Sequence, residues 1–121
     1  MLLRYWDRVG GTLAEEFPAV RASAGAERRR LDGVIVLGGE HRRVAPDQLD
    51  VAGRDIIVVQ AKRGRLGMSL MGQALFSQGL MRPFMPASIR TVALCEKDDS
   101  ALRPLAEQYG IEVEIDDPHR G

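Results

Sequence analysis

Cysteine and histidine are scarce in this chain of 121 residues, which contains one cysteine, Cys95, and two histidines. A single cysteine cannot form an internal disulfide framework, and one thiolate with two widely separated histidines cannot complete a zinc cage. We therefore expect any metal to be held by oxygen ligands. The chain also lacks an apolar run of about 20 residues, as a membrane-spanning helix needs, and it lacks a signal-peptide pattern at its start. These absences predict a cytoplasmic protein with no membrane partner.

The chain also has no net charge, because its 17 lysines and arginines balance 17 aspartates and glutamates. The charges are nevertheless segregated along the chain. Residues 60–90 contain five basic residues and no acidic one, whereas eight acidic residues lie between residue 96 and the end. Residues 21–43 contain six arginines against three acidic residues. This distribution indicates one basic face suited to an anionic partner, although charged loops that are simply solvated give the same pattern.

The length and a composition that is 45% hydrophobic and 28% charged predict one globular domain spanning residues 1–121. Apolar residues at spacings of three and four alternate with runs of β-branched residues. The expected elements are a helix at 2–16, a loop at 21–28, a strand at 31–37, a short strand at 42–45, a strand at 56–62, a helix at 66–81, a strand at 88–95, a helix at 101–109 and an edge strand at 111–115. The helix at 66–81 contains no charged residue, which predicts that neighbours cover most of its surface. The order predicts an α/β sandwich with a central mixed sheet flanked by helices.

Polar side chains interrupt the apolar pattern at the ends of two expected buried strands. Asp32 lies near the start of the first strand, and Gln60 and Lys62 lie near the end of the second. Because side chains alternate along a strand, Gln60 and Lys62 point to the same face, and Asp32 joins them if the two strands are neighbours. The expected first helix ends in Glu15 and Glu16, so that either carboxylate can approach the same point. Such a set of carboxylates, an amide and a lysine suits metal-dependent phosphodiester hydrolysis.

In these residues and in the order of its elements the chain resembles the PD-(D/E)XK nuclease superfamily, which includes restriction endonucleases and Holliday-junction resolvases. The resemblance covers roughly residues 11–95. It implies a restriction-endonuclease-like α/β sandwich that cleaves DNA with Mg²⁺ or Mn²⁺. It further implies that Asp32 is the central metal ligand, that Gln60 replaces the usual Asp or Glu in a Q-x-K variant, and that Lys62 is the motif lysine beside the attacking water.

The resemblance also assigns roles around this centre. Glu15 stands four residues after Gly11, a spacing similar to that of resolvase-like members, and is therefore preferred slightly over Glu16 as the further metal ligand. Gln73, in the next helix, is similar to a glutamine that some members place near the scissile phosphate. The basic residues expected to contact nucleic acid are Arg29, Arg30, Arg63 and Arg65. Gln60 departs from the family pattern because it removes one negative charge, which predicts weaker divalent-ion binding and could mean lost activity.

Two other interpretations stay open at this point. A nuclease-like fold without catalysis could bind nucleic acid or another protein, as the neutral Gln60 and the zero net charge suggest. A regulatory α/β module could instead bind a small acidic ligand through the cluster at residues 28–30. Each residue also has a plain structural role, since Asp32 can pair with a neighbouring arginine and glutamates can solvate a helix end. The small size further favours a two-fold homodimer, which would present two sites to two strands.

Overall fold

The computed structural model describes residues 1–118 and shows an α/β architecture built on one five-stranded mixed sheet. The strands are β1 (Thr12–Val20), β2 (Arg29–Val36), β3 (Asp55–Ala61), β4 (Ser88–Cys95) and β5 (Ile111–Ile115), and they lie side by side in that order. Strands β1, β2 and β3 are antiparallel neighbours, whereas β3, β4 and β5 run parallel. The mixed sheet expected from the sequence is confirmed.

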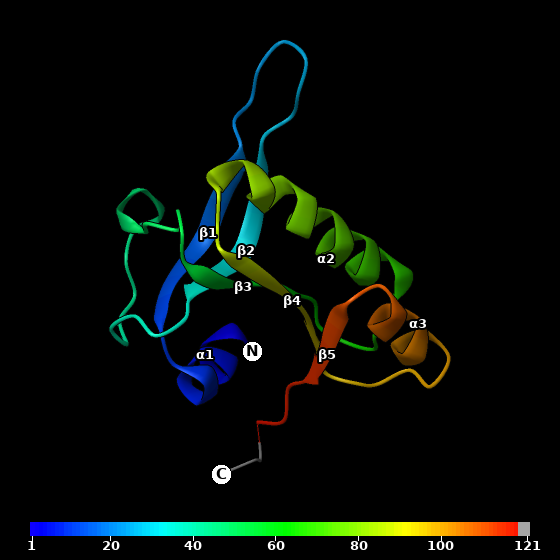
Figure 1. Cartoon of the computed structure of the whole chain (residues 1–121). Helices are drawn as coiled ribbons and strands as arrows, with labels where there is room; N and C mark the ends of the chain where they lie inside the picture. Colours follow the sequence, from blue (N-terminus) through cyan, green and yellow to red (C-terminus); the bar gives the residue numbers. More distant parts are fainter. Residues whose placement is uncertain (119–121) are drawn as a thin grey trace.

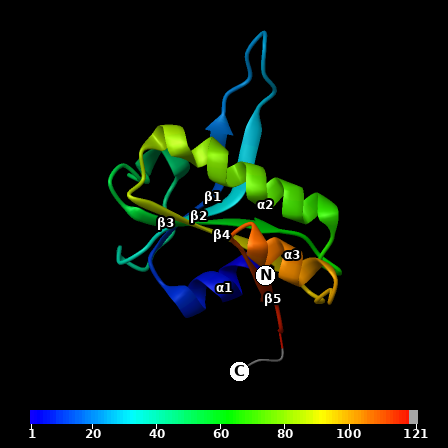
Figure 2. The same cartoon turned by 45° about the vertical axis from the view of Figure 1, so that its right-hand side comes forward.

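Helices cover both faces of the sheet (Figures 1 and 2). α1 (Leu2–Val9) lies on one face and α2 (Met68–Met81) on the other. α3 (Leu102–Gln108) connects β4 to β5 and packs with α2 in one apolar cluster. Two short 3-10 helices, Pro46–Gln48 and Arg82–Phe84, lie in connections. The parallel strands therefore receive the crossover helices that their connections need. Within residues 1–118, no helix is both long enough and apolar enough to span a membrane.

Alternate side chains of β3 contribute to two separate apolar clusters. Ile56 and Val58 pack in a cluster that includes the end of α2, whereas Ile57 and Val59 pack with aromatic residues of α1. All four side chains are fully buried. A central strand that is covered on both faces needs such a continuous apolar run, which is why the sequence shows no alternation here. The same geometry carries Gln60 to the α2 side of the sheet.

The first helix is much shorter than the sequence predicts. It ends at Val9, and Gly10 and Gly11 follow with φ angles of 78° and 83°, in the left-handed region that favours glycine. A Cβ atom on Gly11 would lie 2.4 Å from the carbonyl oxygen of Val36, so a side chain does not fit where the chain passes β2. The predicted helix is therefore wrong in its second half, which forms β1 instead.

A local distortion of β1 explains why this segment has helical spacing. Ala14 and Phe17 pack in the same cluster although they are three residues apart, which regular strand alternation does not allow. Glu16 lies between them with a φ of 53° and interrupts the alternation. Pro18 is tolerated because β1 is the edge of the sheet. Burial at i and i+3 thus arises here from a distorted strand rather than from a helix turn.

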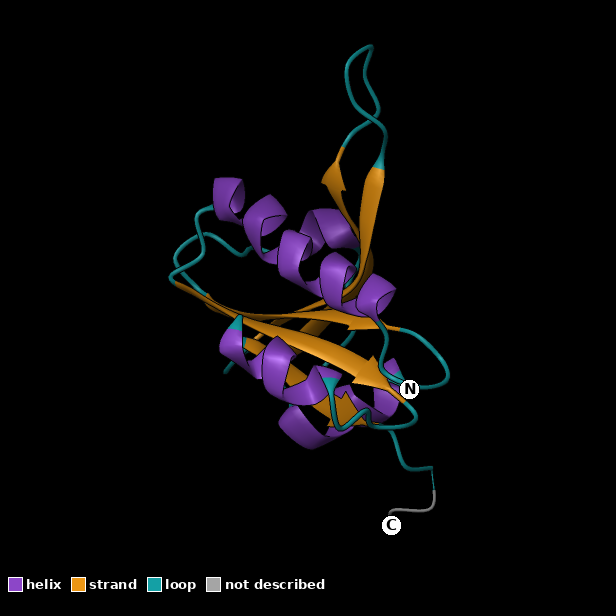
Figure 3. Cartoon of the chain, turned by 90° about the vertical axis from the view of Figure 1, so that its right-hand side faces the viewer, coloured by secondary structure: helices purple, strands orange, loops and turns teal. Residues whose placement is uncertain are grey.

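The later predicted elements are confirmed with small shifts of their ends, with one exception. The short strand expected at 42–45 is reduced to a bridge, in which Leu13 N–H donates to the Arg42 carbonyl at 3.0 Å and Val44 N–H donates to the Leu13 carbonyl at 2.9 Å. Residues 21–28 form the expected loop. This loop is the tip of the β1–β2 hairpin and projects away from the body of the sheet (Figures 1 and 3).

Candidate functional site

The β2–β3 ladder ends in a pair of polar side chains, Asp32 and Gln60, which we call the Asp32–Gln60 fork. The last regular pair joins Gly33 to Val59. One residue further, Oε1 of Gln60 accepts a hydrogen bond from the backbone N–H of Asp32 at 3.3 Å, and the Asp32 carboxylate accepts one from Ala61 N–H at 2.8 Å. Each side chain therefore takes the place of a backbone carbonyl. Beyond the fork β2 stays paired with β1, and β3 stays paired with β4, so that the two strands part.

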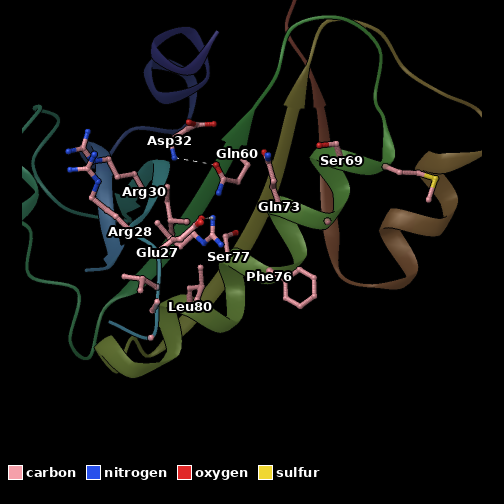
Figure 4. A pocket seen from close by; sticks show the side chains of 17 residues that line it. Glu27, Arg28, Arg30, Asp32, Gln60, Ser69, Gln73, Phe76, Ser77 and Leu80 are labelled. Carbon is pink, nitrogen blue, oxygen red and sulfur yellow. Dashed lines mark hydrogen bonds and ion pairs between the residues drawn. The ribbon is translucent and has the colours of Figure 1, made fainter. Parts of the chain in front are cut away.

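A cleft of about 1100 Å³ opens where the strands part, between the β1–β2 hairpin and α2 (Figure 4). Asp32 and Gln60 both line it, and they are joined there by the hydrogen bond described above. The other polar and aromatic lining residues that bear on function are Arg28, Arg29, Arg30, Ser69, Gln73 and Phe76. The cleft is larger than the range of about 300–1,000 Å³ that is typical of small-molecule pockets. It is therefore large enough for a small molecule or for a segment of an extended chain.

One face of α2 is left uncovered along this cleft. Ser69, Gln73 and Phe76 follow each other at spacings of four and three, which places them on one stripe of the helix. Phe76 is 74% exposed and Met68 is 77% exposed. The prediction that neighbours cover most of this helix is therefore wrong on this side. Sequence reasoning missed Phe76 because a large apolar residue in an uncharged helix is usually a core residue.

The positive charge of the cleft is only partly neutralised. Arg29 pairs with Glu27 at 3.3 Å, whereas Arg28 and Arg30 form no ion pair within residues 1–118. All three arginines are exposed to solvent. Glu27 and Asp32 are the acidic residues in the lining, so that three positive charges face two negative ones. The cleft can therefore attract an anionic chain.

Glu15 and Glu16 lie on β1 and not at the end of a helix, which corrects the sequence prediction. Glu15 pairs with Gly33, the neighbour of Asp32 in β2, and its carboxylate forms an ion pair with Arg43 at 3.2 Å. Glu16 is exposed. Neither glutamate is among the residues that line the cleft. The helical approach to the metal is lost because Gly10 and Gly11 end the helix early.

The basic turn after β3 follows the fork directly. Lys62 N–H donates to the Leu94 carbonyl at 3.0 Å, which continues the hydrogen bonding between β3 and β4. The side chains of Lys62 and Arg63 are exposed and form no ion pair in the described part of the chain. Arg65 differs, because its guanidinium donates to the carbonyl of Asp98 at 2.7 Å. Of these cations, Lys62 and Arg63 are therefore free to meet an anionic ligand, whereas Arg65 is engaged by the loop before α3.

The oxygen atoms of the fork suit a hard cation such as Mg²⁺. Asp32 offers a carboxylate and Gln60 an amide oxygen, and each oxygen that accepts a backbone hydrogen bond retains further acceptor capacity. Among residues 1–118 there is no group of three or more His, Cys, Asp or Glu side chains that could hold a metal ion. Mg²⁺ commonly keeps several waters and is held by one or two carboxylates together with substrate phosphates. Asp32 and Gln60 are therefore the residues of the fork that could hold such an ion together with water and a phosphate.

The single cysteine lies outside this site. Cys95 is fully buried at the end of β4, where burial raises the pKa of its thiol. A thiolate is disfavoured in such surroundings, so Cys95 is a packing residue and not a nucleophile.

The chain thus presents a cleft with excess positive charge and, where β2 and β3 part, a carboxylate and an amide held by backbone hydrogen bonds. Comparison of the chain with models of protein families, with curated proteins and with solved structures finds no match.

Proposed function

We propose that this chain is a nuclease-like domain that hydrolyses phosphodiester bonds of DNA at the Asp32–Gln60 fork with the help of a divalent metal ion. The observation that carries the proposal is the position of the fork, where a carboxylate and an amide oxygen open onto a cleft with excess positive charge. DNA supplies a line of phosphates, which such a cleft attracts. The order of one helix, three antiparallel strands, a second helix and a parallel strand supports the resemblance to the PD-(D/E)XK superfamily.

Asp32 and Gln60 would hold Mg²⁺ or Mn²⁺, with water and a substrate phosphate as the remaining ligands. When bound, such an ion activates a coordinated water and offsets negative charge on the phosphate. The two side chains are held ready for this role, because Ala61 N–H fixes the Asp32 carboxylate and Asp32 N–H fixes the Gln60 amide. Ligands that hydrogen bonds already orient need less reorganisation when the ion arrives.

Lys62 would act on the attacking water or on the phosphate. The hydrogen bond from its N–H to the Leu94 carbonyl continues the parallel pairing, which keeps the chain extended and leaves Lys62 on the same face as Gln60. Its ammonium forms no ion pair within residues 1–118 and can donate hydrogen bonds to either oxygen. Donors directed at charge that develops in a transition state contribute about 10²–10³-fold to the rate.

Glu15 is the better of the two glutamates for a further carboxylate ligand. It pairs with Gly33, beside Asp32, whereas Glu16 has a left-handed backbone conformation. The ion pair of Glu15 with Arg43 is exposed, and such pairs contribute at most about 1 kcal/mol. Alternation from Leu13, which packs against α1, nevertheless places Glu15 on the α1 face of the sheet, opposite to Gln60, so the ion would be held at the fork by Asp32 and Gln60.

A cleavage assay tests the proposed function. The purified chain is incubated with Mg²⁺ or Mn²⁺ and with single-stranded, double-stranded and branched DNA. We expect cleavage of at least one of these substrates, and we expect Lys62→Ala to slow it by at least about 100-fold. Lys97→Ala is the matched control, since Lys97 is also an exposed lysine but follows β4, whereas Lys62 follows β3 directly after the fork; neither lysine is among the residues that line the cleft. Undiminished cleavage by Lys62→Ala would refute the assignment of the site.

A second candidate function is nucleic-acid binding without hydrolysis. The neutral Gln60 favours it, because the fork then carries a single negative charge, on Asp32. Calorimetry with Mn²⁺ separates the two functions. A hydrolytic site should bind the ion in the wild-type chain and lose it in Asp32→Ala, whereas a binding module should bind DNA equally well with and without the ion.

A further inference from the structure

Phe76 gives the cleft a property that phosphate binding does not require. It is 74% exposed on α2 and lines the cleft across from the hairpin arginines Arg28 and Arg30 (Figure 4). The helix itself is well packed, because Leu70 and Ala74 are almost completely buried. The exposure of Phe76 therefore reflects the face on which it lies and not a loosely attached helix.

Gly72 leaves the Phe76 ring uncovered. Side chains on a helix lean toward its N-terminus, so the ring of Phe76 leans over position 72, one turn earlier. Gly72 has no side chain, and a Cβ atom built there would meet nothing within 4 Å. The ring therefore faces an open space inside the cleft, into which another flat group can fit.

An uncovered aromatic ring in a cleft that also has unpaired arginines on its opposite side is suited to bases that are not paired. Every base has a flat face that can stack on an aromatic side chain, and arginines can hold the adjoining phosphates. In a continuous duplex these faces are already occupied by neighbouring base pairs. The ring of Phe76 would gain a stacking partner from a single strand but not from the interior of a duplex.

We propose that the cleft takes single-stranded DNA, with one base stacked on Phe76 and phosphates further along the same strand against Arg28 and Arg30. This inference rests on the proposed function, since the same strand would continue to the Asp32–Gln60 fork for hydrolysis. Gln73 lies on the same stripe of α2 and is exposed, so that its amide can hydrogen-bond to a base edge or a phosphate.

Fluorescence anisotropy of a labelled 20-nucleotide strand, measured in EDTA so that no cleavage occurs, tests the inference. We expect the wild-type chain to bind this strand more tightly than the duplex of the same sequence. Phe76→Ala should raise the Kd for the single strand about tenfold. Phe76→Trp should preserve binding, whereas Phe76→Leu should not, because leucine keeps an apolar contact but offers no ring. Circular dichroism melting shows that each variant is folded.

Three further variants separate stacking from a general surface effect. Gly72→Leu should weaken single-strand binding about as much as Phe76→Ala, because the new side chain covers the ring. Gly79→Leu is its control, since Gly79 also lies in α2 with nothing within 4 Å of a built Cβ atom, but it does not line the cleft. Tyr109→Ala is the control for Phe76, because Tyr109 is a 60% exposed aromatic residue outside the cleft. Neither control should change the Kd.

Equal affinities of the wild-type chain and Phe76→Ala for the single strand would overturn the inference. A dimer that dissociates in Phe76→Ala while DNA binding is unchanged would also overturn it, because the ring would then lie between two copies of the chain. Failure of the proposed hydrolysis looks different. In that case Phe76-dependent binding of the single strand persists without any metal-dependent cleavage. Metal-dependent cleavage of duplex DNA that Phe76→Ala leaves unchanged would refute the inference and support the hydrolysis.

Discussion

The side chain of Gln60 and the backbone of Asp32 are joined by a hydrogen bond of 3.3 Å, at the point where β2 and β3 separate. The Asp32 carboxylate in turn accepts the N–H of Ala61, the residue after Gln60, at 2.8 Å. Two backbone donors that the ladder no longer satisfies are thus paired by side chains. The same oxygen atoms serve stability and, in the proposed function, metal binding. Substitutions that separate these two roles are therefore informative.

Asp32→Asn and Asp32→Ala should differ in stability but agree in function. Asparagine keeps an oxygen that can accept Ala61 N–H, whereas alanine leaves that donor unsatisfied, at a cost of about 1–2 kcal/mol in the free energy of unfolding. Both variants lose the carboxylate and should lose metal-dependent cleavage. Urea unfolding and the cleavage assay measure the two effects. Cleavage by Asp32→Asn at the wild-type rate would show that the carboxylate is not the metal ligand.

Gln60→Glu should make the chain more dependent on metal for its stability. The new carboxylate can still accept a hydrogen bond from Asp32 N–H. It places a second negative charge beside Asp32, however, at a position that is only 7% exposed in the wild-type chain. We expect a lower Tm without metal and a larger rise of Tm on adding Mn²⁺ than in the wild-type chain, because an ion that binds only the folded state stabilises it. Thermal melts with and without Mn²⁺ measure this. The same small rise in both proteins would argue against a metal site at the fork.

Asp116 should make the stability of the chain sensitive to acid. Arg4 of α1 donates two hydrogen bonds to its carboxylate, at 2.9 and 2.5 Å, and these hold the pKa of Asp116 below its ordinary value of 3.8. A pKa that is lower in the folded state stabilises the fold above the unfolded pKa, and this stabilisation is lost as the pH falls through the folded pKa. Asp116→Asn should therefore lower Tm at neutral pH, and the difference from wild type should shrink below about pH 4.

Asp47→Asn serves as the control for this pH dependence. Asp47 is exposed and forms no ion pair within residues 1–118. Its substitution should leave the Tm profile close to that of the wild-type chain at every pH. A difference between Asp116→Asn and wild type that stays constant down to about pH 2 would show that packing, and not the charge on Asp116, stabilises this contact.

Gly11→Ala should destabilise the chain strongly. Gly11 has a φ of 83°, and an added Cβ atom would lie 2.4 Å from the Val36 carbonyl oxygen. We expect a loss of more than about 2 kcal/mol in the free energy of unfolding. Gly79→Ala in α2 is the contrasting substitution, because nothing lies within 4 Å of the added atom, and it should stabilise by up to about 1 kcal/mol. Chemical denaturation measures the free energy of unfolding of both variants. It thereby tests whether the turn at Gly10 and Gly11, which ends α1, requires glycine.

The central elements could be predicted from the sequence because the patterns that indicate them are local. Strand β3 is buried on both faces, so its β-branched run is continuous, and α2 lacks charge and proline over its whole length. The proximity of Asp32 and Gln60 followed from two correctly placed neighbouring strands. Such features depend on a few residues at a time and are therefore visible in the sequence.

The first half of the chain shows where local patterns are not sufficient. Ala14 and Phe17 are three residues apart and both buried in one cluster, as in a helix, but the segment pairs with β2 as a strand. The left-handed conformation of Glu16 makes this spacing compatible with a strand. The role assigned to Glu15 depended on the helix, so that error extended from the fold to the site.

By itself the sequence determined the mixed α/β character of the chain, its two neighbouring buried strands β2 and β3 and the pair of polar residues at their ends. Tertiary structure alone decided that residues 12–20 join the sheet, that the β1–β2 hairpin projects away from its body (Figure 1), and that Phe76 faces a cleft and not a core. The physical reason is that burial of a helix face depends on what packs against it. Strand pairing and the path of the hairpin are relationships between distant segments, which spacing along one segment does not encode.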